Sequence, residues 1–316
     1  MFGRNIKKAF LASSAVGALI VGLDVAPAAA DTVPTFNINP NVLGVTGYST
    51  RTESDINGTS DGLVRQTSAT TQVETGWVQF SSFTNNGAAS NFGTTGLLAE
   101  DNTGTATIAN VYGLYLTFTA TATSITGFGA GQIGTIAPGD FTFTMFADLG
   151  QNDVFNAGAT NSGSGVAPTV SDTGSNDVVL AKAVSVSGSA GFQPITGAPT
   201  FNAISSFILC DGTVNEGVLG GKVIVGGDAT GCGTFDARTY FTAPVPFYSF
   251  DFASTTAGSA QDVNSTSGAT TPNATINGIV VDVNFKNIPE PGTLGMFGVA
   301  LMALGGLIRR RSKAQA

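Results

Sequence analysis

The chain has 316 residues, a formal net charge of −8 and no histidine. The absence of histidine excludes a Ser-His-Asp triad, a Cys-His dyad and a His-ligated zinc or haem. Two cysteines are too few for an all-cysteine zinc site or an ordinary iron–sulfur cluster, and the acidic balance argues against nucleic acid as a partner.

Residues 1–30 have the three parts of a secretory signal peptide. Arg4, Lys7 and Lys8 form a basic start, and the uncharged, mostly apolar stretch 9–23 is short for a membrane span. Ala28 and Ala30 occupy the small-residue positions that signal peptidase requires. We therefore predict an N-terminal signal helix with cleavage after Ala30. The alternative is an uncleaved N-terminal anchor.

The middle of the chain, residues 31–288, is predicted to be a β-rich secreted domain. Gly, Ser and Thr interrupt every candidate helical window, and Thr favours strands. In 114–121, 141–145 and 279–285, apolar side chains alternate with polar ones, which is typical of half-buried strands. Further predicted strands cover 73–80, 178–186, 201–209, 222–226 and 246–252.

Turn signals separate many of these segments. They are Asn57-Gly58, Asp61-Gly62, Asn86-Gly87, Pro138-Gly139, Asp211-Gly212 and Asn277-Gly278. Residues 157–176 and 253–275 are predicted to be loops, and no fixed-period repeat is present. Many short strands with one apolar face indicate an all-β fold, specifically an antiparallel two-sheet sandwich or jelly-roll-like domain.

Asp148, Asn152 and Asp153 form the best candidate metal site. Calcium is bound by oxygen ligands from closely spaced Asp and Asn residues, with a Gly at the turn. The order of an EF-hand loop is not met, because Gly150 stands in the third position and Ala159 in the twelfth. A plain acidic β-turn is the alternative, and no other cofactor is expected.

Cys210 and Cys232 are predicted to form a disulfide around the strand-like segment 222–226. In an oxidising compartment, an even number of cysteines usually pairs, and a loop of this length would stabilise the fold by about 3 kcal/mol. A reactive or intermolecular thiol is the alternative.

An enzymatic function would have to use carboxylates. A glycoside hydrolase needs two of them about 5–10 Å apart, and the spacing selects no pair among the numerical candidates Glu53, Asp55, Glu74, Glu100 and Asp101. The single tryptophan, Trp77, is expected in the core rather than on a sugar-binding surface. We therefore expect no enzymatic activity. A carbohydrate-active hydrolase with paired carboxylates remains the alternative.

The last 28 residues have a different pattern. Pro289, Glu290 and Pro291 precede the uncharged run 293–308, which is followed by Arg309, Arg310 and Arg311. The run is marginal in length for a bilayer core of about 30 Å, and the arginines should stay in the cytoplasm. These residues predict a hydrophobic helix that inserts transiently in the inner membrane. An ordinary stop-transfer segment of a permanently anchored surface protein is the alternative.

This tail, 289–316, resembles the PEP-CTERM sorting domain that exosortases recognise in Gram-negative bacteria. The resemblance implies cleavage near Pro289-Glu290-Pro291 and release of the mature protein to the cell surface or the extracellular medium. Residues 31–288 keep 6 of the 13 basic and 19 of the 21 acidic residues, a net charge of −13. That charge favours solubility and attracts cations.

Four middle segments resemble flocculation-associated PEP-CTERM proteins. They are Tyr112-Gly113-Leu114-Tyr115, Gly139-Asp140-Phe141-Thr142-Phe143, Asn176-Asp177-Val178-Val179-Leu180-Ala181 and Pro246-Phe247-Tyr248-Ser249-Phe250-Asp251. The resemblance implies a secreted, non-enzymatic matrix protein that holds cells together in flocs or biofilms with exopolysaccharide. It supplies no catalytic residues for this chain.

Overall fold

The computed structural model describes one compact unit that begins at Pro34. The described residues are 34–46, 50–86, 88–89, 96–97, 111–126, 128, 132–161, 163–171, 176–192, 199–257, 261–264 and 272–286. The predicted signal helix 1–30 and the predicted sorting helix 293–308 lie outside these residues. Among the residues that the structure describes, no helix has the length and apolar character needed to cross a membrane.

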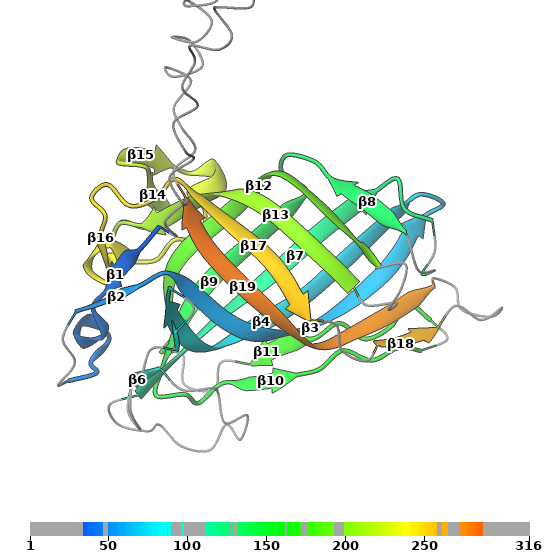
Figure 1. The fold of residues 1–316 in the computed structure, drawn as a ribbon, viewed down its shortest axis with the longest axis horizontal. Helices are drawn as coiled ribbons and strands as arrows, with labels where there is room; N and C mark the ends of the chain where they lie inside the picture. The colour runs from blue at the N-terminus through cyan, green and yellow to red at the C-terminus, as the bar shows by residue number, and fades with distance from the viewer. Residues whose placement is uncertain are drawn as a thin grey trace, which may run out of the picture. The chain divides into compact units, whose positions relative to one another are not determined.

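The described unit is built almost entirely from strands (Figure 1). The strands are β1 (Phe36–Ile38), β2 (Arg51–Glu53), β3 (Asp55–Ser68), β4 (Thr71–Asn85), β5 (Ala88–Ala89), β6 (Gly96–Leu97), β7 (Val111–Thr123), β8 (Ile133–Ile136), β9 (Phe141–Leu149), β10 (Val154–Asn156), β11 (Thr169–Ser171), β12 (Val178–Phe192), β13 (Pro199–Cys210), β14 (Glu216–Leu219), β15 (Lys222–Val225), β16 (Phe241–Ala243), β17 (Phe250–Ala257), β18 (Gln261–Asn264) and β19 (Asn273–Lys286). Three 3₁₀ helices are described: η1 (Pro40–Leu43), η2 (Gly227–Ala229) and η3 (Ala237–Thr239). The predicted all-β class is confirmed.

The main sheet closes on itself through antiparallel pairs. In the order β13, β17, β19, β3, β4, β7, β9 and β12, each strand pairs with the next, and β12 pairs back with β13. Opposite sides of the closed sheet therefore pack their inner faces across one core, as the two layers of the predicted sandwich would, but hydrogen bonds continue from one side to the other. Figure 1 shows β17 and β19 crossing in front of β7 and β9.

Alternating side chains produce this core. On β7, Leu114, Leu116 and Ala120 point inward and are buried, whereas Thr117 and Thr119 point outward. On β9, Phe141, Phe143 and Met145 point inward in the same way. Because side chains alternate between the two faces of a strand, each apolar residue of the predicted pattern reaches the same interior.

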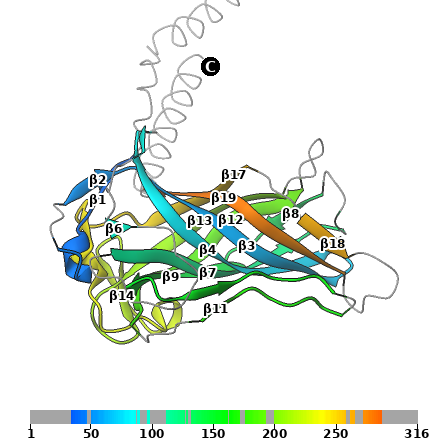
Figure 2. The same cartoon turned by 90° about the horizontal axis from the view of Figure 1, so that it is seen from below.

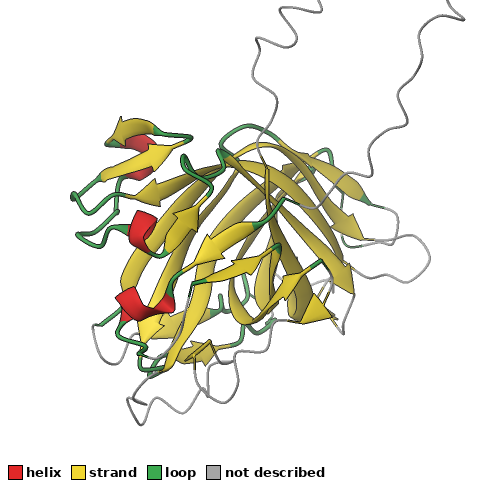
Figure 3. Cartoon of the chain, turned by 60° about the vertical axis from the view of Figure 1, so that its left-hand side comes forward, coloured by secondary structure: helices red, strands yellow, loops and turns green. Residues whose placement is uncertain are grey.

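One end of the interior is filled by aromatic rings. Phe285 packs against Phe36, Phe207 and Phe247 with ring centroids 4.9, 4.7 and 5.1 Å apart. The small sheet β16-β1-β2 contributes Phe36 and Phe241 to this cluster. Figure 3 shows the short helices gathered on one side of the described unit. In the chain, η1 follows β1 and η3 precedes β16.

A second cluster lies on the outer face of the main sheet, where the β10–β11 hairpin covers β4, β7 and β9 (Figure 2). Trp77 is 6% exposed and contacts Phe155 of the hairpin at a ring-centroid distance of 5.1 Å. Its indole Nε1 donates a hydrogen bond to the carbonyl of Asn156 at 3.1 Å. Trp77 is thus a packing residue, as expected, although it packs outside the closed sheet.

Three of the predicted turns are wrong because they lie inside strands, and two of these are in β3. Asn57-Gly58 and Asp61-Gly62 lie inside β3. A Cβ on Gly58 would come within 2.2 Å of the Gln79 carbonyl oxygen, and one on Gly62 within 2.5 Å of Glu74 Oε1. These glycines allow atoms of the neighbouring strand β4 to approach the β3 backbone closely. An Asn-Gly or Asp-Gly dipeptide that serves this purpose looks the same in sequence as one that forms a turn.

Other boundaries also differ from the prediction. The predicted loop 253–275 contains the end of β17, all of β18 and the start of β19. The strand predicted over 246–252 begins only at Phe250. Asn277-Gly278 is a bulge within β19, with Gly278 at φ +63°. Short polar strands lack the apolar alternation that makes a strand visible in sequence.

Candidate functional site

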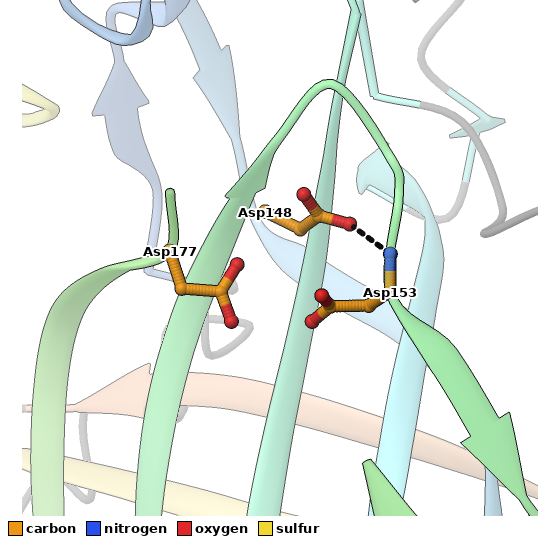
Figure 4. A group of neighbouring side chains, drawn as sticks. All are labelled: Asp148, Asp153 and Asp177. Carbon is orange, nitrogen blue, oxygen red and sulfur yellow. Dashed lines mark hydrogen bonds between the residues drawn. The ribbon is translucent and has the colours of Figure 1, made fainter. Parts of the chain in front are cut away.

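Three carboxylates converge at one end of the β9–β12 pair (Figure 4). Asp148 lies near the end of β9, Asp153 just before β10, and Asp177 just before β12. One carboxylate oxygen from each lies within 4.8 Å of the others. The predicted residues Asp148 and Asp153 are therefore brought together, and Asn152 of the same turn is buried.

A tight turn positions the first two carboxylates. Gly150 at φ +111° and Gln151 at φ +54° reverse the chain after β9. The backbone amide of Asp153 then donates to Asp148 Oδ2 at 3.0 Å. Glycine is the residue that adopts such positive φ values most readily, which explains the Gly in this acidic segment. Both carboxylates are 0% exposed.

Asp177 reaches the cluster through strand pairing. Val178 of β12 is paired with Ala147 of β9, which places the preceding Asp177 beside the turn. The Asn176 side-chain amide donates to the Leu149 carbonyl and ties this segment to the end of β9. The local spacing of acidic residues did not indicate Asp177, because Asp177 lies far along the chain from the turn. Only the β9–β12 register brings its carboxylate close to the other two.

Tyr115 borders the cluster from β7. Its hydroxyl donates a hydrogen bond to Asp177 Oδ2, and its ring stacks on Phe146 at 4.9 Å. Burial, followed by the nearby charges of Asp177 and Asp153, holds the pKa of Tyr115 above its ordinary value. The tyrosine therefore stays protonated and acts as a hydrogen-bond donor.

The chemistry of the cluster is that of a hard-cation site. Like charges at this separation repel strongly inside a protein unless protons or a cation offset them. Ca²⁺ takes six to eight oxygen ligands, and carboxylates binding through one or two oxygens supply them. The residues present thus fit calcium, and Asp148, Asp153 and Asp177 would hold it.

Of the carboxylates named for a hydrolase, Asp55 and Glu74 do not form a pair of this kind. Asp55 is paired with Thr84, and Glu74 with Val64. From Asp55 to Val64 along β3 is about 30 Å at about 3.3 Å per residue, far beyond the separation used by glycosidases. Asp55 also accepts hydrogen bonds from the hydroxyls of Ser54 and Thr84. Glu100 and Asp101 lie outside the described residues.

The two cysteines are joined. Cys210, the last residue of β13, and Cys232 form a disulfide with a Cα–Cα distance of 5.3 Å. The bridge encloses the β14–β15 hairpin, which continues the sheet beyond β13. The strand predicted over 222–226 is therefore present inside the loop as β15, one arm of this hairpin.

The fold and the carboxylate cluster define an all-β protein with a closed antiparallel sheet and a candidate calcium site. Residues 287–311 match the PEP-CTERM protein-sorting motif, which confirms the predicted sorting signal. The match spans Pro289, Glu290 and Pro291 together with Arg309–Arg311. No curated protein and no solved structure is significantly similar to the chain.

The motif identifies the chain as an exosortase substrate that is exported to the cell surface or the extracellular space. The predicted cleavage site at Ala28 and Ala30 lies outside the described residues, as does the sorting motif itself.

Proposed function

We propose that this protein is a non-enzymatic component of the extracellular matrix that promotes flocculation or biofilm cohesion together with exopolysaccharide. The observation that carries the proposal is the sorting motif at 287–311. A protein with this motif is delivered to the surface, where it meets secreted polymer. Signal peptidase would remove residues 1–30, and exosortase would cut near Pro289-Glu290-Pro291.

The charge of the mature domain supports this role. Residues 31–288 carry a net charge of −13, which keeps the secreted domain soluble and attracts cations. An anionic polysaccharide would be repelled, so divalent cations would have to bridge it to the protein. The proposal therefore expects cohesion to weaken when divalent cations are chelated.

The experiment begins with deletion of the gene and measurement of cell aggregation and matrix retention. The proposal expects both to fall and wild-type protein to restore them. Unchanged aggregation and retention in the deletion strain would remove the matrix role. Glycosidase activity in the protein recovered from the secreting cells, lost on Asp→Asn or Glu→Gln substitution, would favour the hydrolase alternative.

A matched pair of variants tests sorting separately. Replacing Pro289, Glu290 and Pro291 by alanine should retain the protein in the inner membrane, whereas Lys313→Ala, outside the matched residues, should not. Mass spectrometry of the secreted wild-type chain should find its end near residue 288. An intact Arg309–Arg311 tail on the surface protein would favour the permanently anchored alternative.

A further inference from the structure

Side chains fill one end of the interior of the closed sheet but leave a cavity at the other end. The end under β1, β2 and β16 holds large inward side chains such as Phe207 and Phe285. At the other end, inward positions on β7, β12 and β17 carry alanines: Ala120, Ala122, Ala190 and Ala253. Small side chains leave a cavity of about 70 Å³ that is partly open to solvent. Closed sheets of about eight strands can hold one small ligand in this way.

Glycines shape the wall of this cavity. Gly62 and Gly76 are paired across β3 and β4. A Cβ on Gly76 would approach the Phe118 ring to 2.9 Å, and one on Gly62 would approach Glu74 Oε1 to 2.5 Å. Neither glycine has a positive φ, so a turn does not require them. They leave room for the neighbouring backbone, where a Cβ on Gly76 would come within 2.2 Å of the Asp61 carbonyl oxygen, and for the side chains of Phe118 and Glu74, which line the cavity.

Glu74 is the only ionisable side chain among the described residues that line the cavity. No hydrogen bond or ion pair of its carboxyl group occurs within the described residues. Burial alone raises the pKa of Glu74 to about 7. Three other polar side chains of the wall are engaged: Thr255 Oγ1 accepts from the Phe201 amide at 3.0 Å, Thr200 Oγ1 donates to the Gly191 carbonyl at 3.2 Å, and Gln72 Nε2 donates to Gln66 Oε1 at 2.9 Å. The Ser60 hydroxyl also lines the wall.

We propose that this cavity binds a short primary alkylamine, with its ammonium group on the Glu74 carboxylate and its carbon chain against Val64, Phe118, Phe141, Phe201 and Ile276. A half-buried carboxylate in an apolar cavity, without a donor, is stabilised most by a ligand that supplies charge-assisted hydrogen bonds. An anionic ligand would find no Lys or Arg in the described wall. The net charge of −13 on residues 31–288 also attracts cations to the domain.

The size of the cavity limits the ligand. On the measure that gives about 70 Å³ for this cavity, one water molecule needs about 10–15 Å³, so about five to seven non-hydrogen atoms fit, as in a four-carbon amine. Butylamine is therefore the probe, and butanol and butyrate are its matched neutral and anionic controls. Titration followed by ligand-observed NMR, with protein recovered from the secreting cells, gives the three dissociation constants. Butylamine should bind at least tenfold more tightly than either control at pH 9.

The pH dependence of butylamine binding reports on the ionisation of the Glu74 carboxyl group. A primary amine with a pKa near that of Lys, about 10.4, stays charged from pH 5 to 9. A carboxyl group with a pKa of about 7 is about 1% ionised at pH 5, so butylamine should bind about a hundredfold more weakly there than at pH 9. The lining residues of β3, β7, β9, β12, β13, β17 and β19 are uncharged.

Asp61, Arg65, Asp251 and Asp282 lie on strands of the wall but do not line the cavity. Asp61 and Arg65 of β3 and Asp282 of β19 alternate with inward residues and lie on the outer face. Asp251 of β17 faces the interior two residues from Ala253 but does not line the cavity. Asp228→Asn, an exposed substitution with the same charge change, should leave both the affinity and its pH dependence unchanged.

Two variants decide the proposal. Glu74→Gln should weaken butylamine binding at pH 9 at least tenfold and abolish its pH dependence. Ala190→Leu keeps the carboxyl group but fills the cavity, and it should also weaken binding at least tenfold. Equal affinity for butylamine, butanol and butyrate at pH 9 would overturn the proposal. So would wild-type binding by either variant, or no binding of butylamine at all.

Discussion

The carboxyl group of Glu74 lies over Gly62 on the neighbouring strand, and a Cβ at position 62 would approach Glu74 Oε1 to 2.5 Å. The register pairs Glu74 with Val64, so the acidic side chain reaches along β3 toward the glycine rather than straight across. This arrangement keeps a carboxyl group inside the closed sheet, where burial raises its pKa to about 7.

The first prediction concerns the pH dependence of stability. The folded pKa of Glu74 lies above its unfolded value of 4.5, so the folded state binds more protons between pH 4.5 and 7. The free energy of unfolding therefore falls as pH rises through this window, by at most about 3 kcal/mol from this group. In Glu74→Gln, urea unfolding at pH 5 and pH 8 should show a smaller decrease than in the wild type.

The control for this prediction is Asp228→Asn, an exposed carboxylate. Its unfolding free energy should follow the wild-type pH profile. If Glu74→Gln loses as much stability between pH 5 and pH 8 as the wild type, the Glu74 carboxyl group is not the source of the dependence.

The second prediction concerns Asp251, which is 0% exposed in the core. Both of its carboxyl oxygens and the hydroxyl of Ser205, its neighbour in register, lack hydrogen-bond partners among the described residues. Burial raises the pKa of Asp251 well above its ordinary value of 3.8, so the folded carboxyl group keeps its proton to a higher pH than the unfolded one.

Between pH 3.8 and the raised folded pKa, the unfolded Asp251 ionises while the folded one keeps its proton. Each pH unit in that window lowers the free energy of unfolding by at most about 1.4 kcal/mol. Asp251→Asn removes this loss, so its stability relative to the wild type should rise with pH in chemical denaturation. A constant difference between the two proteins from pH 4 to pH 8 would contradict the assignment.

The core of the fold was predictable where apolar and polar side chains alternate strictly along a strand. Leu114, Leu116 and Ala120 were placed on one face from sequence alone, and they share the interior. Glycines inside β3 were mistaken for turns because a dipeptide such as Asp61-Gly62 does not reveal whether glycine is needed for positive φ or for close approach. The closure of the sheet depends on β12 pairing with both β9 and β13, which no local pattern encodes.

The candidate calcium site was predictable only in its local part. Asp148 and Asp153 flank one turn, so spacing alone identified them. Asp177 joins them through the pairing of Val178 with Ala147, a contact between distant parts of the chain. The cavity carboxyl Glu74 was one acid among many until the inward register of β4, shared with Val78 and Phe80, placed it inside.

The third prediction tests the link between β7 and the segment after η3. The hydroxyls of Tyr112 and Tyr240 are 2.9 Å apart, and both side chains are 0% exposed. Removing one hydroxyl leaves the other buried without this partner, so Tyr112→Phe or Tyr240→Phe should each cost about 1–2 kcal/mol. The double variant should cost less than the sum, measured as a double-mutant cycle by urea unfolding. Additive costs would show that the two hydroxyls do not interact energetically.

The fourth prediction concerns the disulfide between Cys210 and Cys232, both of which are buried. The bridge restricts the unfolded chain and holds the β14–β15 hairpin against the end of β13. The Cys210→Ala, Cys232→Ala double variant should lose about 3 kcal/mol of unfolding free energy. A reductant should lower the melting temperature of the wild type toward that of the variant and leave the variant unchanged. An unchanged melting temperature of the wild type would show that the bridge adds no stability.

The fifth prediction concerns calcium at Asp148, Asp153 and Asp177. A cation that binds only the folded state stabilises it in proportion to the logarithm of its concentration, so Ca²⁺ should raise the melting temperature and chelation should lower it. Asp177→Asn should abolish this response, because it removes one of the three charges that converge within 4.8 Å. Asp228→Asn, an exposed change of the same charge, should keep the full response. Without calcium, Asp177→Asn should be at least as stable as the wild type, since it relieves repulsion between the carboxylates. A Ca²⁺ response that persists in Asp177→Asn would place the cation elsewhere on the acidic surface.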